Sequence, residues 1–357
     1  MSEREKNIVV AVDAMGGDNA PEAIVRGAAV ATLESPGKVI LVGDERKIAE
    51  ILAKETYDAE RLEIVPADET IEMSDVPRDA VRRKPNASMI VAVRLCAEGR
   101  AHGVVSAGNT GAYVLASSLY IPRIVNVRKT AIATVYPTRN VQKREDHFAL
   151  LLDVGANIHC SVDDMVQFAL MGKIYASDIK GIEDPTVALL NIGKESYKGG
   201  ELLSTVYRIL DDLPDVNFIG NIEGNELMLG VSDVVVTEGY VGNIVTKMME
   251  GMAETASHLG RYAFKHRLLW RLGLIALSGG IRRLKRSTDY SEYGGAPLLG
   301  FKEIVIKAHG RSGAKAITNA IKLAAKSHRD DICGRIEREI AEFESGNYNK
   351  DIDITSL

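Results

Sequence analysis

Six short segments of the sequence combine glycine with Asp, Asn, Ser or Thr, the residue types that an anion site requires. Glycine lets the backbone approach a ligand closely, and backbone N–H groups and short polar side chains donate hydrogen bonds to it. The six segments are Asp13–Asp18, Ser106–Gly111, Asp153–Asn157, Asn191–Glu195, Thr237–Asn243 and Ala308–Gly313. Together they suit a polar cradle for phosphate.

Each segment, taken singly, is also what a tight turn followed by a helix requires, because turns favour glycine and helix N-caps favour Ser, Thr and Asn. Ligands of open α/β sheets bind beyond the carboxyl ends of the strands. We expect all six segments at one such edge, which is more than turn formation needs. We therefore expect this edge to bind a ligand.

The elements that must position these segments are short β-branched runs, each followed by a glycine-containing turn and a stretch of helical periodicity. This alternation predicts an α/β protein with three α/β/α layers and a largely parallel sheet. Most of the runs are continuously apolar, as strands covered on both faces are. The predicted strands are Ile8–Val12, Val39–Val42, Glu63–Val65, Gly103–Val105, Ala131–Val135, Phe148–Leu152, Val187–Asn191, Asn217–Ile219, Asp233–Val236 and Ile304–Lys307.

Several enzyme classes lack their signatures here. No Gly-x-x-x-x-Gly-Lys-Ser/Thr run occurs and no Gly-x-Gly-x-x-Gly follows the first strand, so a nucleotide triphosphatase and an ordinary dinucleotide enzyme lose support. Gly-x-Ser-x-Gly and His-Glu-x-x-His are also absent, which argues against a hydrolase of that type and a metalloprotease.

The composition indicates a protein of the reduced cytoplasm without a metal site. The cysteines Cys96, Cys160 and Cys333 have no CxxC spacing, and no base marks Cys160 as a nucleophile. The apolar stretches are too short or too broken to span a bilayer. The net charge of −5 over 357 residues gives no reason to expect nucleic-acid binding.

Three motifs identify a family. Val12–Asp18, Ser106–Ala112 and Leu152–Asn157 resemble, in order and spacing, the PlsX family of acyl-ACP:phosphate acyltransferases, where ACP is acyl carrier protein. Tyr293–Gly300 and Lys307–Gly310 add to the resemblance, which covers nearly the whole chain.

The resemblance implies a homodimer without a bound cofactor, with an α/β/α fold similar to that of isopropylmalate dehydrogenases and phosphotransacetylases. It implies an enzyme that makes acyl phosphate from inorganic phosphate and a fatty acyl thioester on acyl carrier protein. The product would pass to a membrane acyltransferase that acylates glycerol 3-phosphate in phospholipid synthesis. We expect one catalytic domain over residues 1–357, with two subdomains as the alternative.

Phosphate dianion is a competent nucleophile near neutral pH, so the site must mainly position it and stabilise an oxyanion. From composition alone Lys198 would be a solvated lysine, but the resemblance favours it as the principal phosphate-binding cation. The catalytic candidates are Lys198, Asn109, His309 and Asn243. The substrate-binding candidates are Gly16, Gly17, Asp18, Ser106, Gly108, Thr110, Gly111, Asn157 and Gly193.

The segment Thr255–Thr288 contains no acidic residue but eight basic ones, interleaved with Phe264, Trp270 and several leucines. Helical spacing and the glycines Gly273 and Gly279 predict a protruding amphipathic hairpin over residues 258–290. Such a surface suits an anionic membrane or the acidic carrier protein, and a solvated helix that packs in a dimer is the alternative. The candidate contact residues are Arg261, Lys265, Arg271, Arg282, Arg283, Lys285 and Arg286.

Two other functions stay open. One is a phosphotransacetylase-like enzyme that uses short acyl-CoA. The other is a non-catalytic protein of the lipid surface, which the basic segment alone suggests and the six polar segments argue against. With the basic segment at a membrane, the protein would be peripheral at the inner face.

Overall fold

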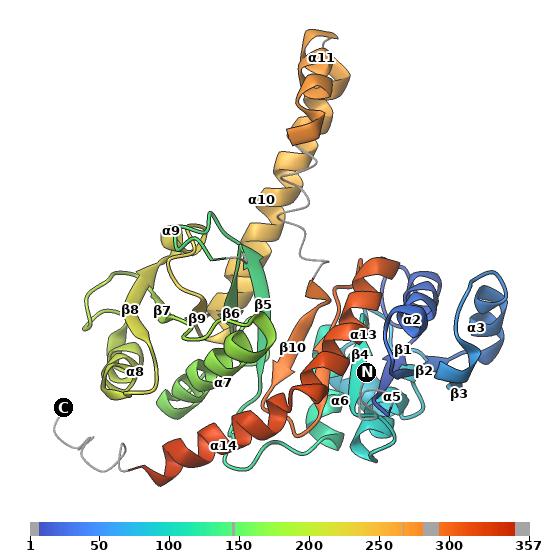
Figure 1. The fold of residues 1–357 in the computed structure, drawn as a ribbon, viewed down its shortest axis with the longest axis horizontal. Coiled ribbons are helices and arrows are strands. Elements are labelled where there is room, and N and C mark those ends of the chain that lie inside the picture. The colour runs from blue at the N-terminus through green and yellow to red at the C-terminus, as the bar shows by residue number, and fades with distance from the viewer. Residues whose placement is uncertain (1–6, 145–146, 267, 281–292, 347–357) are drawn as a thin grey trace.

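The structure is a computed structural model that describes residues 7–144, 147–266, 268–280 and 293–346. An eleven-stranded sheet runs through it in the order β3-β2-β1-β4-β11-β10-β5-β6-β9-β7-β8 (Figure 1). The strands are β1 (Val9–Asp13), β2 (Lys38–Gly43), β3 (Leu62–Pro66), β4 (Gly103–Ser106), β5 (Ala131–Pro137), β6 (Phe148–Leu152), β7 (Val187–Asn191), β8 (Phe218–Glu223), β9 (Val234–Val236), β10 (Ala296–Leu299) and β11 (Ile304–Lys307).

Two parallel blocks of strands make up this sheet. Block 1 is β3-β2-β1-β4-β11, mostly blue in Figure 1, and block 2 is β6-β9-β7-β8, in green and yellow. Between them, β10 pairs antiparallel with β11 and β5, and β5 pairs antiparallel with β6. The two blocks therefore run in opposite directions within one sheet.

Helices cover both faces of each block. The helices are α2 (Glu22–Glu34), α3 (Glu45–Leu52), α4 (Pro77–Arg83), α5 (Ser88–Ala97), α6 (Thr110–Tyr120), α7 (Val162–Lys180), α8 (Gly200–Asp212), α9 (Gly224–Leu227), α10 (Gly239–His266), α11 (Leu268–Ala276), α13 (Ala314–Arg329) and α14 (Ile332–Ser345). On block 1, α2 and α13 pack on one face and α5 and α6 on the other. On block 2, α7 and α8 lie on one face and α9 and α10 on the other.

The predicted α/β/α fold with a largely parallel sheet is confirmed, because alternate residues of the continuously apolar strands are buried on opposite faces. In β1, Val10 and Val12 contact the α2 side, while Ala11 contacts the α5 side. The prediction missed β10, a four-residue strand that follows Gly295 and contains Pro297. Proline and glycine usually mark a loop, which hid the strand.

The expectation that all six polar segments share one sheet edge is wrong. The segments after β1, β4 and β11 belong to block 1, whereas those after β6, β7 and β9 belong to block 2. The antiparallel strands β10 and β5 reverse the strand direction between the blocks.

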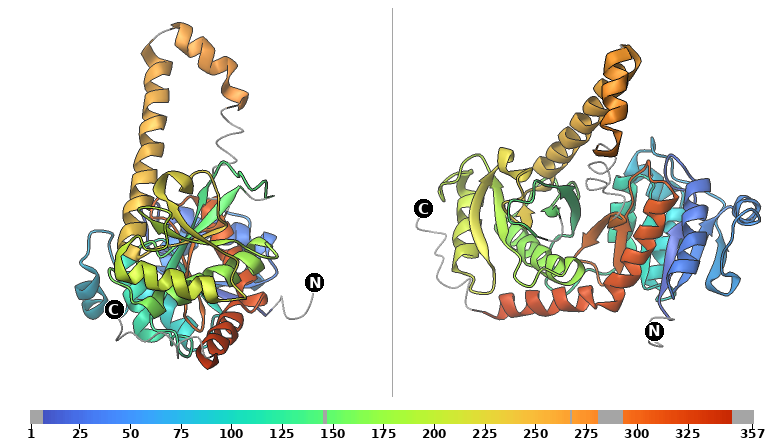
Figure 2. Two further views of the ribbon diagram at one scale, coloured as in Figure 1. Left: turned by 90° about the vertical axis from the view of Figure 1, so that its left-hand side faces the viewer. Right: turned by 45° about the horizontal axis from the view of Figure 1, so that its top comes forward.

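A helical hairpin stands out from the body. The 28-residue α10 leaves block 2, and α11 folds back beside it at the far end (Figures 1 and 2). Gly273, expected to break a helix, lies inside α11, which begins at Leu268, whereas α10 ends at His266. No helix in the described ranges is long and apolar enough to cross a membrane.

Candidate active site

Three polar residues end three adjacent strands of block 1 and form a row across the sheet. Val12 is in register with Val105, which places Asp13 beside Ser106, and Ser106 is in register with Lys307. Residues in register on parallel strands project toward the same face, so a carboxyl, a hydroxyl and an amine extend from one face of the sheet in the row Asp13–Ser106–Lys307. All three residues are buried.

Asp13 organises the loops around it. Its carboxylate accepts hydrogen bonds from the Ser88 hydroxyl at 2.6 Å, the Ser106 hydroxyl at 2.7 Å and the Met15 N–H at 3.3 Å. Burial raises the pKa of Asp13, and the hydrogen bonds from Ser88 and Ser106 offset part of this rise. Asp13 thus ties β1 to β4 and to the start of α5.

The substrate-binding candidates Gly16, Gly17 and Asp18 lie where the loops after β1, β4 and β11 meet. A Cβ on Gly16 would lie 2.2 Å from Asp13 Oδ2 and 2.9 Å from the Gly108 nitrogen. Gly17 has a φ of +110°, and the Asp18 N–H donates to the Gly310 carbonyl at 2.8 Å. The close approach of these backbones requires glycine.

The loop after β4 is one of the six segments predicted to form the phosphate cradle, but several of its polar groups are used within the protein. The Ser106 hydroxyl donates to Asp13 and accepts from the Gly108 N–H at 3.0 Å. Asn109 caps α6 by accepting from the Ala112 N–H at 3.1 Å, and its amide donates to the carbonyls of Met73 and Asp75. These contacts shape the loop.

Thr110 and Gly111 are the substrate-binding candidates of this loop that are exposed to solvent. Both are exposed in the first turn of α6, where helical N–H groups have no intrahelical acceptor. A Cβ on Gly111 would lie 2.7 Å from the ring of Pro77. The exposed start of α6 is therefore the part of the loop that a phosphate can approach.

Lys307, the last residue of β11, was missing from the sequence-based site. Its side chain is only 7% exposed, and its ammonium donates to the carbonyl of Ala308. Burial lowers the pKa of Lys307 to about 8, with Asp13 and Asp18 acting in the opposite direction. A lysine that directly ends the apolar run Ile304–Ile306 was the signal in the sequence.

His309, in the loop after β11, faces α10. Its Nε2 lies 3.7 Å from Glu250 Oε1, and its Nδ1 accepts from the Arg311 N–H at 3.1 Å. Desolvation lowers the pKa of His309 more than Glu250 raises it. The imidazole is therefore mainly neutral near pH 7.

In block 2, the loop after β6 is built around Asp153. This buried carboxylate accepts from the N–H groups of Ile132, Gly155, Ala156 and Asn157. The side-chain amide of the predicted binding residue Asn157 donates hydrogen bonds to the Asp153 carboxylate and the Thr130 carbonyl. Its side chain therefore stabilises the loop.

The catalytic candidate Asn243 lies next to this loop, in the first turns of α10. A Cβ on Gly155 would lie 3.5 Å from the Asn243 Cβ, and Asn243 is exposed. Because Val154 and Ala156 pack against the block 1 core, the loop after β6 adjoins block 1. Asn243 therefore lies on the side of block 2 nearest block 1.

Lys198 and Gly193 lie apart from the other candidates. They precede α8, which packs on α7, β7 and β8 of block 2. The Lys198 ammonium lies 5.7 Å from the centroid of the Tyr197 ring, and the Asn191 amide holds the Lys198 carbonyl at 2.9 Å. No hydrogen bond or ion pair within the described ranges joins Lys198 to the loop after β4.

Cys160 is half-buried, and its N–H donates to the Glu238 carboxylate at 3.2 Å. Burial raises the pKa of its thiol to about 11. The thiol stays protonated near neutral pH, so Cys160 is a poor nucleophile.

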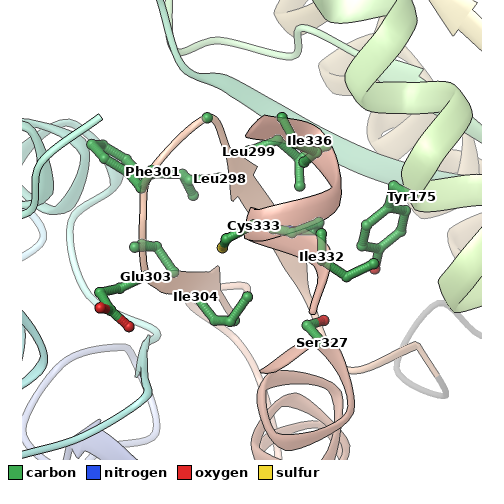
Figure 3. Close-up of a pocket in the computed structure, with 13 residues that line it drawn as sticks. Tyr175, Leu298, Leu299, Phe301, Glu303, Ile304, Ser327, Ile332, Cys333 and Ile336 are labelled. Carbon is green, nitrogen blue, oxygen red and sulfur yellow. The ribbon is translucent and has the colours of Figure 1, made fainter. Parts of the chain in front are cut away.

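Two hollows lie away from these loops. One, between β10, β11 and α14, is lined by apolar side chains such as Leu298, Ile304 and Ile336 (Figure 3) and has a volume of about 10 Å³, room for one water. Another, of about 260 Å³, lies near the amino ends of β1, β2 and β3 beside Lys38 and Arg100. Neither adjoins the loops at the carboxyl ends of block 1.

The hairpin exposes both charge and apolar surface. Arg261, Lys265 and Arg271 are exposed, and the Arg271 guanidinium lies 5.1 Å from the centroid of the Phe264 ring. Trp270 is 46% exposed. The other contact candidates, Arg282, Arg283, Lys285 and Arg286, lie outside the described residues.

Sequence comparisons point to one family. The chain matches the family model described as fatty acid synthesis protein over residues 8–335. It is 45% identical over 317 residues to a phosphate acyltransferase of Dictyoglomus thermophilum, which covers 89% of this chain and 93% of that protein. It is 39% identical over 342 residues to a phosphate acyltransferase of Clostridium perfringens, which covers 96% and 99% respectively.

Solved structures show the same fold at low sequence identity. A phosphotransacetylase from Streptococcus pyogenes matches with a TM-score of 0.61 and 17% identity, over 92% of this chain and 99% of that chain. A branched-chain phosphotransacylase from Enterococcus faecalis matches with a TM-score of 0.54 and 17% identity, over 90% and 99%.

Proposed function

This chain belongs to the family of fatty acid synthesis proteins and is similar to phosphate acyltransferases over most of its length, and we propose that it is an acyltransferase of this kind. It transfers a fatty acyl group from acyl carrier protein to inorganic phosphate. The products are acyl phosphate and the free thiol of the carrier protein. A membrane acyltransferase then uses acyl phosphate to acylate glycerol 3-phosphate, the first step toward phospholipid.

The observation that carries this proposal is the meeting of three loops at the carboxyl edge of block 1. The Asp18 N–H is bonded to the Gly310 carbonyl, and Gly16 lies against Gly108, so the family motifs after β1, β4 and β11 share one place. The helices α6 and α13 both start there. The N-terminus of a helix binds anions such as phosphate. Direct attack by phosphate requires a bound and oriented anion and no covalent enzyme intermediate.

In the proposed reaction, phosphate attacks the thioester carbonyl directly. The N–H groups of Thr110 and Gly111 bind its charge at the start of α6, while Ser106, Gly108 and Asn109 hold the loop in shape. Gly16, Gly17 and Asp18 form the adjoining wall.

Residues beside α10 complete this arrangement. His309 and Asn243 donate hydrogen bonds to the oxyanion that forms on the thioester carbonyl. Lys198 and Gly193 contribute a phosphate contact from block 2, a role that the resemblance suggests and that a substitution of Lys198 tests directly.

The basic hairpin is proposed to bind the enzyme to the acyl carrier protein or to the membrane surface. Its exposed Arg261, Lys265 and Arg271 suit the acidic surface of the carrier protein or an anionic membrane, and Trp270 suits a lipid interface. We place the enzyme, as a homodimer, in the cytoplasm and peripherally at the inner face of the membrane.

The test is an assay of the purified chain with one acyl donor at a time. Fatty acyl carrier protein should release free thiol and form acyl phosphate only when phosphate is present. Faster use of a short acyl-CoA would instead favour a phosphotransacetylase-like enzyme. No phosphate-dependent release from any donor, together with binding to anionic vesicles, would leave the non-catalytic lipid-surface protein.

A further inference from the structure

Lys307 has a position that folding alone does not explain. It is 7% exposed, and no other lysine or arginine of the described ranges is buried. A buried ammonium loses its hydration, which destabilises the fold unless the charge is compensated. No ion pair within the described residues joins Lys307 to a carboxylate, and its ammonium donates to the carbonyl of Ala308. The protein therefore keeps a poorly compensated amine at the carboxyl end of β11.

Its neighbours hold this amine at the site. Lys307 is in register with Ser106, whose hydroxyl is fixed on Asp13 by a hydrogen bond of 2.7 Å. Three charged groups affect the pKa of Lys307. Asp13 at the end of β1 and Asp18 in the loop after β1 raise it, and Lys247 of α10 lowers it. His309, two residues further along the chain, lies within electrostatic reach. Lys307 thus ends β11 where the loop after this strand begins, within electrostatic reach of Asp13 and Asp18.

The proposed reaction needs a proton at one particular step. When the tetrahedral intermediate breaks down, the thiolate and the attacking phosphate compete as leaving groups, and protonation of the sulfur favours loss of the thiol over return of phosphate. A thiol has an ordinary pKa of about 8.5. A donor of similar pKa transfers its proton most effectively, and burial lowers the pKa of Lys307 to about 8.

We propose that the Lys307 ammonium, held at the end of the Asp13–Ser106–Lys307 row, protonates the thiolate that leaves when phosphate attacks the acyl thioester. This inference rests on the acyl transfer to phosphate proposed above and names the general acid for it.

The step balances without a further reactant. A phosphate oxygen forms the new C–O bond, the C–S bond breaks, and its electron pair takes a proton from Lys307. Acyl phosphate is a stronger acid than phosphate, so the proton that the phosphate dianion carried is released and restores the ammonium. One proton is given and one is received in each cycle.

The other basic candidates suit this role less well. His309 lies 3.7 Å from Glu250 and is mainly neutral near pH 7, because desolvation lowers its pKa. Lys198 is proposed above to contact the phosphate, which leaves the thiolate to another group. Lys247 is exposed and pairs with Glu250 at 2.8 Å.

The experiment compares two acyl donors that differ in the leaving thiol, with the full chain and saturating phosphate. One donor is acyl carrier protein, whose thiol is an ordinary alkyl thiol. The other is an S-aryl thioester, whose thiol is far more acidic and leaves without a proton. For the wild type, kcat with the alkyl donor should fall above pH about 8, and kcat with the aryl donor should stay level.

Substitutions make the same comparison at one pH. Lys307→Met should lower kcat with the alkyl donor by about 100-fold or more, the usual contribution of a general acid, and should lower kcat with the aryl donor by less than about tenfold. Lys307→Arg keeps the charge but holds its proton, so it should remain impaired with the alkyl donor. Lys302→Met is the control, because Lys302 is exposed and lies 3.7 Å from Glu337; it should keep wild-type rates.

Equal losses with both donors in Lys307→Met, or a wild-type kcat in Lys307→Arg, would overturn the role. If Lys307→Met does not fold, the wild-type pH profiles decide, since an alkaline fall shared by both donors also overturns it. Absence of any phosphate-dependent thiol release in the wild type would refute the proposed function itself. Phosphate-dependent release with no difference between donors refutes the role of Lys307 alone.

Discussion

Glu250 of α10 lies 3.7 Å from His309 in the loop after β11, measured from Oε1 to Nε2. One helical turn further along, Glu254 pairs with Arg311 at 2.5 Å. Exposed pairs of this kind contribute little to stability. These two contacts instead orient α10 of block 2 relative to the loop after β11 in block 1.

Glu250→Gln should lower the pKa of His309 further. The Glu250 carboxylate favours the charged imidazolium, and its neutral replacement leaves desolvation and the nearby cations unopposed. An NMR titration of the histidine ring signals measures the change. Lys143→Gln, a substitution in a distant loop, serves as the control. A pKa that stays the same or rises would show that the two side chains do not interact in solution.

Ser88→Ala should reduce the free energy of unfolding by about 1.5–3 kcal/mol, the usual contribution of a hydrogen bond to a charged group. The lost bond is the one of 2.6 Å to Asp13. Its loss should also raise the pKa of Asp13. Urea denaturation measures the stability, and Ser118→Ala, at an exposed site on α6, should change it by less than about 0.5 kcal/mol. Similar values for both variants would contradict the role of Ser88.

Gly16→Ala should destabilise the protein by about 1–3 kcal/mol through overpacking and should lower activity. The new Cβ would lie 2.2 Å from Asp13 Oδ2 and 2.9 Å from the Gly108 backbone, so the loops must separate. Gly260→Ala is the matched control, since its Cβ meets nothing within 4 Å on α10. The helix propensity of alanine should make that variant slightly more stable. Thermal melting and the thiol-release assay test both.

Lys198→Ala should raise the KM for phosphate by about 10- to 100-fold, the loss expected for one hydrogen bond between charged groups. The side chain has little packing to lose, so the melting temperature should stay near that of the wild type. Lys194→Ala removes an exposed neighbour that pairs with Glu226 at 2.7 Å and should leave the phosphate KM unchanged. An unaltered phosphate KM in well-folded Lys198→Ala protein would remove Lys198 from the site.

Replacing Arg261, Lys265 and Arg271 together with Ser should weaken sedimentation with anionic vesicles, raise the KM for acyl carrier protein, or both. Each basic residue near an anionic bilayer contributes about 1 kcal/mol, and added salt should weaken the binding. Lost vesicle binding with normal soluble kinetics identifies the membrane as the partner, and the converse identifies the carrier protein. Wild-type values in both measurements would indicate a solvated face. The same measurements apply to Arg282, Arg283, Lys285 and Arg286.

The sequence was sufficient to predict ten strands because a strand covered on both faces must be apolar at every position, as Val104 and Val105 are. It did not reveal the order of those strands. The reversal of block 2 depends on β10, whose Pro297 and flanking glycines resemble a loop. Without that strand, the polar segments of both blocks were expected at one edge.

The loops of the candidate site were predictable from the sequence, but the contacts between their residues were not. Ser106 was recognised in a glycine-rich turn, yet its hydroxyl is bound to Asp13, 93 residues earlier in the chain. Ser88 carries no motif at all. Lys307 stood inside a recognised motif, but only the pairing of β11 with β4 shows that it lies in register with Ser106. Such contacts between distant residues are set by topology, which local patterns do not encode.

Because α10 is one continuous helix, it fixes both how far the hairpin extends and how its tip is rotated about the helix axis. Its 28 residues span about 42 Å at about 1.5 Å per residue, without a break between the Asn243 region and the turn into α11. One inserted residue would rotate the tip by about 100° relative to His309, whereas seven would nearly restore the angle and move the tip about 10 Å outward. A partner bound at the tip is therefore held at a fixed angle about the α10 axis relative to the loop that contains His309.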